Sequence, residues 1–152
     1  MQLTSSAFGQ HGAIPAKHTG EGADVSPALS WTDVPQGTKF IAVICHDPDA
    51  PLVTPRGTYG FVHWVLYNIP ASTTSLAEGS AEYTAGKNDF GKSGYCGPMP
   101  PKGHGKHHYY FWILALNSDA KLEAGLNLWD FLKRVESSVI GMNRLIGTYI
   151  RN

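Results

Sequence analysis

The sequence has little cysteine, no excess of charge of either sign and no long apolar run. Two cysteines are too few for a disulfide framework. Twelve basic and twelve acidic residues cancel, so no long-range field would attract DNA or an anionic membrane surface. The longest aromatic and aliphatic run, residues 109–116, is too short to span a bilayer. We therefore expect no nucleic-acid partner and no membrane insertion, and any anion must be bound by local contacts.

The start of the chain and its length set the next two expectations. The first ten residues lack a basic region followed by an apolar stretch, which a secretory signal would have. We therefore expect a soluble, cytoplasmic protein. At 152 residues and 42% hydrophobic composition the chain can bury one substantial core. Residues 1–152 are therefore predicted to form a single domain.

Short apolar runs separated by turn residues indicate a mainly β protein. Seventeen glycines and ten prolines punctuate the chain. Residues 39–46, 60–68 and 107–116 are rich in β-branched and aromatic side chains, which predicts central strands buried on both faces. Residues 71–94 are small and polar without a clear period. They predict a long surface loop, of the kind that is often functional or mobile.

Helical periodicity occurs near the end of the chain, from residue 127 to about residue 141. Asn127 is a suitable N-cap, and Asp130 would lie in the first turn, where a negative charge is favourable. The apolar stripe of this predicted helix should face the core. It comprises Leu128, Phe131, Leu132, Val135 and Val139.

Two carboxylates follow the first predicted central strand in the motif C-H-D-P-D-A-P. If the strand continued, Asp47 and Asp49 would share one face, and the two neighbouring prolines would stiffen the exit from the strand. The same motif is also common turn chemistry, in which the acids would be solvated. The motif alone does not decide between these interpretations.

A histidine lies in the middle of the second predicted strand. A buried imidazole such as His63 needs a hydrogen-bond partner, which could be the carboxylate of Asp47 or Asp49, or a backbone group. Simple alternation would place four side chains on one face of this strand. They are Phe61, His63, Val65 and Tyr67.

The third predicted strand begins with H-H-Y-Y-F, directly after a loop rich in proline and glycine. Alternation places His107 and Tyr109 together on one face and His108 on the other. The preceding loop, G-P-M-P-P-K-G-H-G, is stiffened by proline, and its glycines let the backbone approach a ligand closely. One end of the sheet would therefore combine imidazoles, a phenol and a rigid loop.

These segments together resemble the phosphatidylethanolamine-binding protein family, also called the Raf kinase inhibitor protein family, and within it the short bacterial and archaeal branch. The resemblance is carried by D-P-D-A-P, V-H-W-V-L-Y-N-I-P and G-P-M-P-P-K-G-H-G-K-H-H-Y, with S-P-A-L-S-W before them and L-I-G-T-Y after them. It covers nearly the whole chain. It implies a β-sandwich-like fold with a large central antiparallel sheet, a smaller sheet packed on it and one C-terminal α-helix.

The resemblance also implies an anion pocket at one end of the large sheet. Histidine and tyrosine side chains can donate hydrogen bonds to phosphate oxygens, and aspartates can orient the imidazoles and raise their proton affinity. Carried over to this sequence, the ligand-binding residues are Asp47, Asp49, His63, Met99, Pro100, Pro101, His107 and Tyr109.

Several positions depart from the family pattern. His108 stands where an arginine is common, Lys106 where bacterial members often carry proline, and Met99 where they often carry cysteine. Without the guanidinium, a permanently charged, fork-shaped donor is missing. The resemblance therefore leaves the ion pair at this position unspecified.

The function implied by the resemblance is non-catalytic binding of a small anionic or phosphate-bearing ligand, such as a phospholipid head group, a phosphorylated residue or a nucleotide. It also implies a kinase or protease partner that the protein inhibits, and a homodimer. No cofactor is expected.

An alternative is a metal-assisted hydrolase, because imidazole and carboxylate suit zinc or manganese. Against it, the sequence contains no H-E-x-x-H helix, P-loop or G-x-S-x-G elbow. His107 and His108 would also face opposite ways on a strand. The residues available for such a cluster are His46, Asp47, Asp49, His63, His104, His107 and His108.

Overall fold

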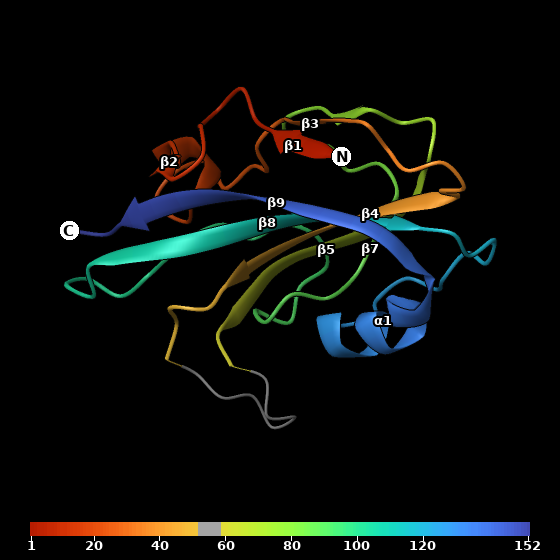
Figure 1. Ribbon diagram of the computed structural model, residues 1–152. Helices are drawn as coiled ribbons and strands as arrows, with labels where there is room; N and C mark the ends of the chain where they lie inside the picture. Colours follow the sequence, from red (N-terminus) through yellow and green to blue (C-terminus); the bar gives the residue numbers. More distant parts are fainter. Residues whose placement is uncertain (52–58) are drawn as a thin grey trace.

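The computed structural model describes residues 1–51 and 59–152, which form two β-sheets and one α-helix (Figure 1). The smaller sheet has the strand order β1-β3-β6 and consists of β1 (Gln2–Thr4), β3 (Leu29–Thr32) and β6 (Ser75–Leu76). The larger sheet has the order β2-β9-β8-β4-β5-β7. Its strands are β2 (Gly12–Ala13), β4 (Phe40–Asp47), β5 (Phe61–Pro70), β7 (Thr84–Ala85), β8 (Lys106–Leu116) and β9 (Val139–Ile150).

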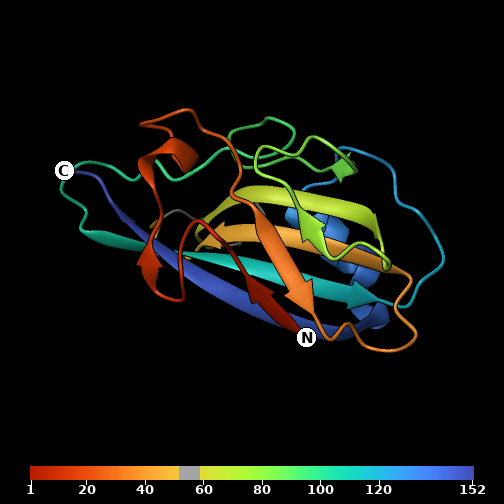
Figure 2. The ribbon, with the colours of Figure 1, turned by 90° about the horizontal axis from the view of Figure 1, so that it is seen from above.

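The arrangement confirms the predicted fold class. The large sheet is antiparallel except at its edge, where β2 runs parallel to β9. Seen from above, β1 and β3 of the small sheet lie over the strands of the large sheet (Figure 2). The helix α1 (Leu128–Val135) lies on the opposite face of the large sheet (Figure 1). The central strands β4, β5 and β8 are therefore covered on both faces, as their apolar composition predicts.

The core consists of two apolar clusters, one on each face of the large sheet. Between the sheets, Trp31 of β3 packs with residues of β4, β5 and β8 that include Trp64 and Phe111. Under the helix, Tyr67 of β5 stacks on Phe131 of α1, with ring centroids 5.0 Å apart. These two clusters fix the sheets and the helix relative to one another.

The C-terminal helix is shorter than its periodicity suggests. Its predicted N-cap is confirmed, because Asn127 Oδ1 accepts a hydrogen bond from the Asp130 amide at 2.8 Å. The prediction that the helix continues to about residue 141 is wrong: α1 ends at Val135, the 3-10 helix η2 (Glu136–Ser138) follows, and Val139 begins β9. Among the described residues no helix has the length and apolar character needed to cross a bilayer.

Two glycines explain why β9 does not read as a strand in the sequence. A side chain at Gly147 would come within 2.6 Å of Ile14, and one at Gly141 within 2.6 Å of Pro35. Glycine is disfavoured inside strands but is used where another segment approaches the backbone closely. The small residues that weaken the strand pattern are therefore required by packing.

The N-terminal segment lies along the outer edge of β9. Besides the pairing of β2 with Gly147 and Thr148, the His11 amide donates to the Ile146 carbonyl, and the Gln10 side chain accepts from the Ile146 amide. Farther along, the Asn143 side chain donates to the Met1 carbonyl. The first fourteen residues thereby complete the hydrogen bonding of this edge.

A β-bulge in β5 changes the predicted faces of that strand. Cys45 is opposite Trp64 and His46 is opposite Val62, so His63 is an extra residue on β5. A bulge interrupts the alternation of side chains and re-aims the bulged residue.

The prediction that residues 61, 63, 65 and 67 share a face is therefore wrong. Val65 and Tyr67 pack toward α1, as does Val62, whereas Trp64 and Leu66 pack between the sheets. His63 instead belongs with Phe61 at the end of the sheet. In β8 the prediction is confirmed: His107 and Tyr109 are buried on one face, and His108 lies on the other.

The stretch predicted as a long loop, residues 71–94, contains the two-residue strands β6 and β7. β6 closes one edge of the small sheet, and β7 closes one edge of the large sheet. The remainder of this stretch contributes one wall of the pocket described next.

Candidate functional site

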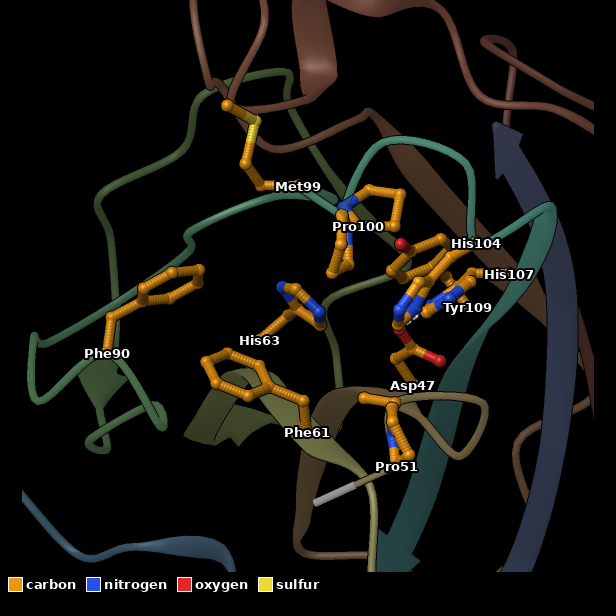
Figure 3. A pocket seen from close by; sticks show the side chains of 12 residues that line it. Asp47, Pro51, Phe61, His63, Phe90, Met99, Pro100, His104, His107 and Tyr109 are labelled. Atoms are coloured by element: carbon orange, nitrogen blue, oxygen red, sulfur yellow. Dashed lines mark hydrogen bonds and ion pairs between the residues drawn. The ribbon is translucent and has the colours of Figure 1, made fainter. Parts of the chain in front are cut away.

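A pocket of about 260 Å³ opens at one end of the large sheet (Figure 3). The end of β4, the beginnings of β5 and β8, and two loops meet there, because antiparallel neighbours bring these ends together. The lining residues are Asp47, Ala50, Pro51, Phe61, His63, Phe90, Met99, Pro100, Pro101, His104, His107 and Tyr109.

A buried ion pair forms one side of the pocket. Nδ1 of His107 lies 2.7 Å from Oδ2 of Asp47, and both side chains are 4% exposed. The other carboxylate oxygen of Asp47 accepts the amide of Asp49 at 2.8 Å. Asp47 therefore fixes the orientation of the His107 ring.

The hydroxyl of Tyr109 lies in the same part of the pocket. The residue is buried, and although its hydroxyl lies near enough to the Asp47 carboxylate to interact with it, no partner among the described residues meets hydrogen-bond geometry. Burial, followed by the negative charge of Asp47, raises the pKa of Tyr109. The phenol therefore stays protonated and can donate a hydrogen bond to a ligand.

His63 is held by a backbone group and not by a carboxylate. Its Nδ1 lies 2.7 Å from the carbonyl oxygen of Cys96, and the Cys96 amide donates to the His63 carbonyl at 3.1 Å. Of the two partners considered from the sequence, the backbone is the one observed. Burial lowers the pKa of His63, although Cys96 and Asp47 partly oppose this effect.

Aromatic side chains form the opposite wall. Phe61 and Phe90 meet edge to face with centroids 4.7 Å apart, and both lie against the His63 ring. Phe90 belongs to a loop organised by Asn88, whose buried side chain accepts from the Phe90 and Lys92 amides and donates to the Gly94 carbonyl. The pocket therefore has one polar side and one apolar side.

The proline-rich loop covers the pocket. Pro100 is buried. Met99 packs so closely against Gly20 that any side chain at position 20 would clash with it. The Gly103 amide bonds to the Arg151 carbonyl beyond β9, and the His104 ring stacks on His107 at 5.6 Å. Contacts with three separate parts of the chain thus hold the loop over the imidazoles.

Asp49, predicted as a site residue, is not among the residues that line this pocket. β4 ends at Asp47, and the chain then turns, so strand alternation no longer applies. Oδ2 of Asp49 accepts the backbone amide and Nδ1 of His108, at 2.7 and 2.6 Å. Partial burial would raise the pKa of Asp49, but the bonds to His108 lower it. Asp49 therefore anchors the turn to the outer face of β8.

The structure brings the other seven predicted site residues together and adds five more. His104 was considered only as a metal ligand, and the remaining four were not predicted as site residues. Phe61 could have been found from its place two residues before His63, because alternation puts both on one face of the strand. Phe90 lies in the predicted surface loop, where no pattern marked it. The five are Ala50, Pro51, Phe61, Phe90 and His104.

The side chains that line this pocket suit a small polar ligand. No lysine or arginine is among the described lining residues, so any positive charge must come from histidine. Within 1–51 and 59–152 no three His, Cys, Asp or Glu side chains are arranged to hold a metal ion. Burial and the nearby Asp47 raise the pKa of Cys45, which keeps this thiol unreactive.

Comparisons with known proteins agree with this geometry. Residues 4–150 match the family model described as phosphatidylethanolamine-binding protein. The chain is 40% identical to a UPF0098 protein of Methanothermobacter thermautotrophicus, with 99% of each chain covered. It is 38% identical to a UPF0098 protein of Aquifex aeolicus, covering 100% of this chain and 90% of the relative.

Two solved structures have a similar fold. The phosphatidylethanolamine-binding protein homologue CT736 of Chlamydia trachomatis has a TM-score of 0.90 and 36% identity, covering 99% of this chain and 97% of its own. YbcL of Escherichia coli, described as a member of the mammalian PEBP family, has a TM-score of 0.89 and 31% identity. The alignment covers 99% of this chain and 98% of YbcL.

Proposed function

Because the chain belongs to the phosphatidylethanolamine-binding protein family, we propose that its pocket binds a small anionic ligand with a phosphate group, without catalysing a reaction. The observation that carries this proposal is the hydroxyl of Tyr109, a buried donor without a partner among the described residues. Buried polar groups are nearly always paired. A ligand oxygen would supply the missing partner.

The neighbouring groups support an anion in particular. When its ring carries both hydrogens, His107, oriented by Asp47, presents its second ring nitrogen as a donor beside Tyr109. A volume of about 260 Å³ has room for a phosphate with a short substituent, and the apolar wall would contact that substituent. Small-molecule sites commonly combine an apolar lining with a few placed polar groups.

Binding without catalysis is proposed because neither cysteine lines the described pocket. Cys45 is buried, its pKa is raised, and it does not line the pocket. The metal-assisted hydrolase gains no support from the placement of the histidines, because His46 and His108 lie outside the lining. A kinase or protease partner, a homodimer and a cytoplasmic location follow from the sequence and the family resemblance and stay proposals.

Removing one hydroxyl tests the proposal. Tyr109→Phe breaks no hydrogen bond among the described residues, so the free energy of unfolding should not fall. Phosphate affinity, measured by calorimetry, should fall about tenfold to a hundredfold, the range for a hydrogen bond to a charged group.

Tyr67→Phe is the matched control. The Tyr67 hydroxyl donates to the Glu123 carbonyl and accepts from the Leu126 amide, far from the pocket. Its loss should cost about 1–3 kcal/mol of stability and leave phosphate affinity unchanged. Failure of the parent protein to bind phosphate, or an unchanged affinity in Tyr109→Phe, would contradict the proposed function.

A further inference from the structure

The hydrogen bond to Cys96 determines what His63 can offer a ligand. A carbonyl oxygen only accepts hydrogen bonds, so Nδ1 of His63 must carry the hydrogen in the 2.7 Å contact. In the neutral ring, Nε2 is then an acceptor. Nε2 has no hydrogen-bond partner among the described residues, and the ring points into the pocket (Figure 3).

The surroundings of His63 keep this ring neutral. The side chain is 3% exposed, and burial outweighs the attraction of the nearby carboxylates, so the pKa of His63 is lowered. The titratable groups that face it from β4, β8 and the two loops are His46, Asp47, Asp89, His104, His107 and Tyr109.

The polar side of the pocket therefore combines donors with one acceptor. Tyr109 donates, and His107 donates when it is protonated against Asp47. The Asp47–His107 pair is then neutral overall, and no lysine or arginine lines the described pocket to balance a second negative charge. A dianion would be repelled by the lone pair on Nε2 of His63. A ligand without a hydrogen to donate would leave that acceptor unpaired, at a free-energy cost.

On the basis of the proposed anion binding, we infer that His63 makes the pocket selective for an oxyanion that carries a proton. A phosphate monoester in its monoanionic form fits this requirement, because it has oxygens for Tyr109 and His107 and a hydroxyl that can donate to Nε2 of His63. A sulfate ester has no such hydrogen, and neither does a phosphodiester. The pocket therefore favours phosphate monoesters over sulfate esters and over phosphodiesters that have no other hydrogen-bond donor.

Three small anions of the same charge and similar size test whether a proton on the ligand determines the affinity. Methyl phosphate, methyl sulfate and dimethyl phosphate are nearly all monoanions at about pH 5, because methyl phosphate loses its second proton with a pKa of about 6. In calorimetric titrations of the parent protein, methyl phosphate should bind at least about tenfold more tightly than either of the others, the equivalent of one unpaired buried acceptor.

A change of pH adds an independent readout. Methyl phosphate loses its second proton with a pKa of about 6, so its affinity should fall more than about tenfold between pH 6 and pH 8. Unchanged affinity over that interval would overturn the inference.

Two variants assign the selectivity to His63. Asparagine at position 63 can retain a donor to Cys96 but has no ring nitrogen facing the ligand, so His63→Asn should bring the three affinities within about threefold of one another. Tyr67→Phe changes a hydroxyl that bonds to Glu123 and Leu126, outside the pocket lining, so it should keep the preference of the parent.

The outcomes separate this inference from the proposed function. If the parent binds methyl sulfate or dimethyl phosphate as tightly as methyl phosphate, anion binding stands and the role of His63 is overturned. A preference that survives in His63→Asn also overturns that role. If none of the probes binds, the proposed function and the inference both fail.

Discussion

His63 and His107 are both held through Nδ1, but the two bonds have different consequences. His63 donates to a neutral carbonyl, whereas His107 faces a buried carboxylate at 2.7 Å. Removing the His63 ring would leave a neutral carbonyl without its donor, but removing the His107 ring would leave a buried carboxylate without its donor. Leaving a charge unpaired in the interior is the more costly change.

His107→Ala should therefore lower the free energy of unfolding by about 3–5 kcal/mol, the range for breaking a buried ion pair. His107→Asn can keep an N–H group near the position of Nδ1 and should lose less stability. Chemical denaturation of the parent and both variants checks this expectation. Equal losses in the two variants would show that packing of the ring, and not its bond to Asp47, carries the effect.

At the scale of residues, the sequence predicts which chemical groups occur in the site better than it predicts the face on which each side chain lies. The phenol and imidazole of β8 were placed on the correct face because that strand is regular over 107–112. The direction of the Asp49 side chain was predicted wrongly because Asp49 lies in a turn. The faces of the residues around His63 were predicted wrongly because His63 lies on a bulge. Neither irregularity leaves a mark that period-two alternation can detect.

At the scale of elements, the loop that carries Phe90 depends on one buried side chain. Asn88 is 4% exposed and makes three hydrogen bonds within the loop, to the Phe90 and Lys92 amides and the Gly94 carbonyl. An asparagine that bonds to nearby backbone groups in this way fixes a turn. The hydrogen bonds of Asn88 therefore hold the loop that carries Phe90 in the pocket wall.

Asn88→Ala should lower stability by about 1–3 kcal/mol, because buried backbone groups lose their partners. Amide hydrogen exchange in residues 89–94 should become faster, because the loop opens locally. Asn117→Ala is the control, since Asn117 is exposed and such surface changes are usually within about 0.5 kcal/mol. Unchanged exchange in the loop would show that other contacts hold Phe90 in place.

Elements with strong apolar patterns were predicted, and those defined by distant contacts were not. β4, β5 and β8 were each located to within two residues at both ends, because they are apolar and covered on both faces. β9 was missed, and its first residues were assigned to the helix. Its sequence lacks a strand pattern because Gly141 and Gly147 are needed to make room for Pro35 and Ile14. β6 and β7 are too short to carry a pattern.

At the scale of the whole molecule, the order of strands joins parts of the chain that are far apart in sequence. β2 pairs with the end of β9, and β8 joins β9 to β4 in the middle of the large sheet. Each of these pairings closes a long loop before it gains stability. The overall fold was accessible from the sequence only through the family resemblance, because short-range patterns do not determine which strands are neighbours.

This topology predicts slow folding. Refolding after dilution from denaturant, followed by tryptophan fluorescence, should show its main phase in the range of about milliseconds to seconds, as expected for sheet proteins dominated by long-range contacts. Trp31 and Trp64 report on it, because both lie in the core between the sheets. A main phase in the microsecond range would mean that local structure, and not strand pairing, limits the rate.

The contacts of residues 10–14 with β9 also have a practical consequence. They satisfy N–H and C=O groups around Ile146 and Thr148 that would otherwise be open to a strand from another molecule. Proteolytic trimming of this segment, or a bulky fusion that pulls it away, would expose a template for intermolecular sheet extension. Affinity tags and crystallisation fusions for this protein are therefore better attached after Asn152.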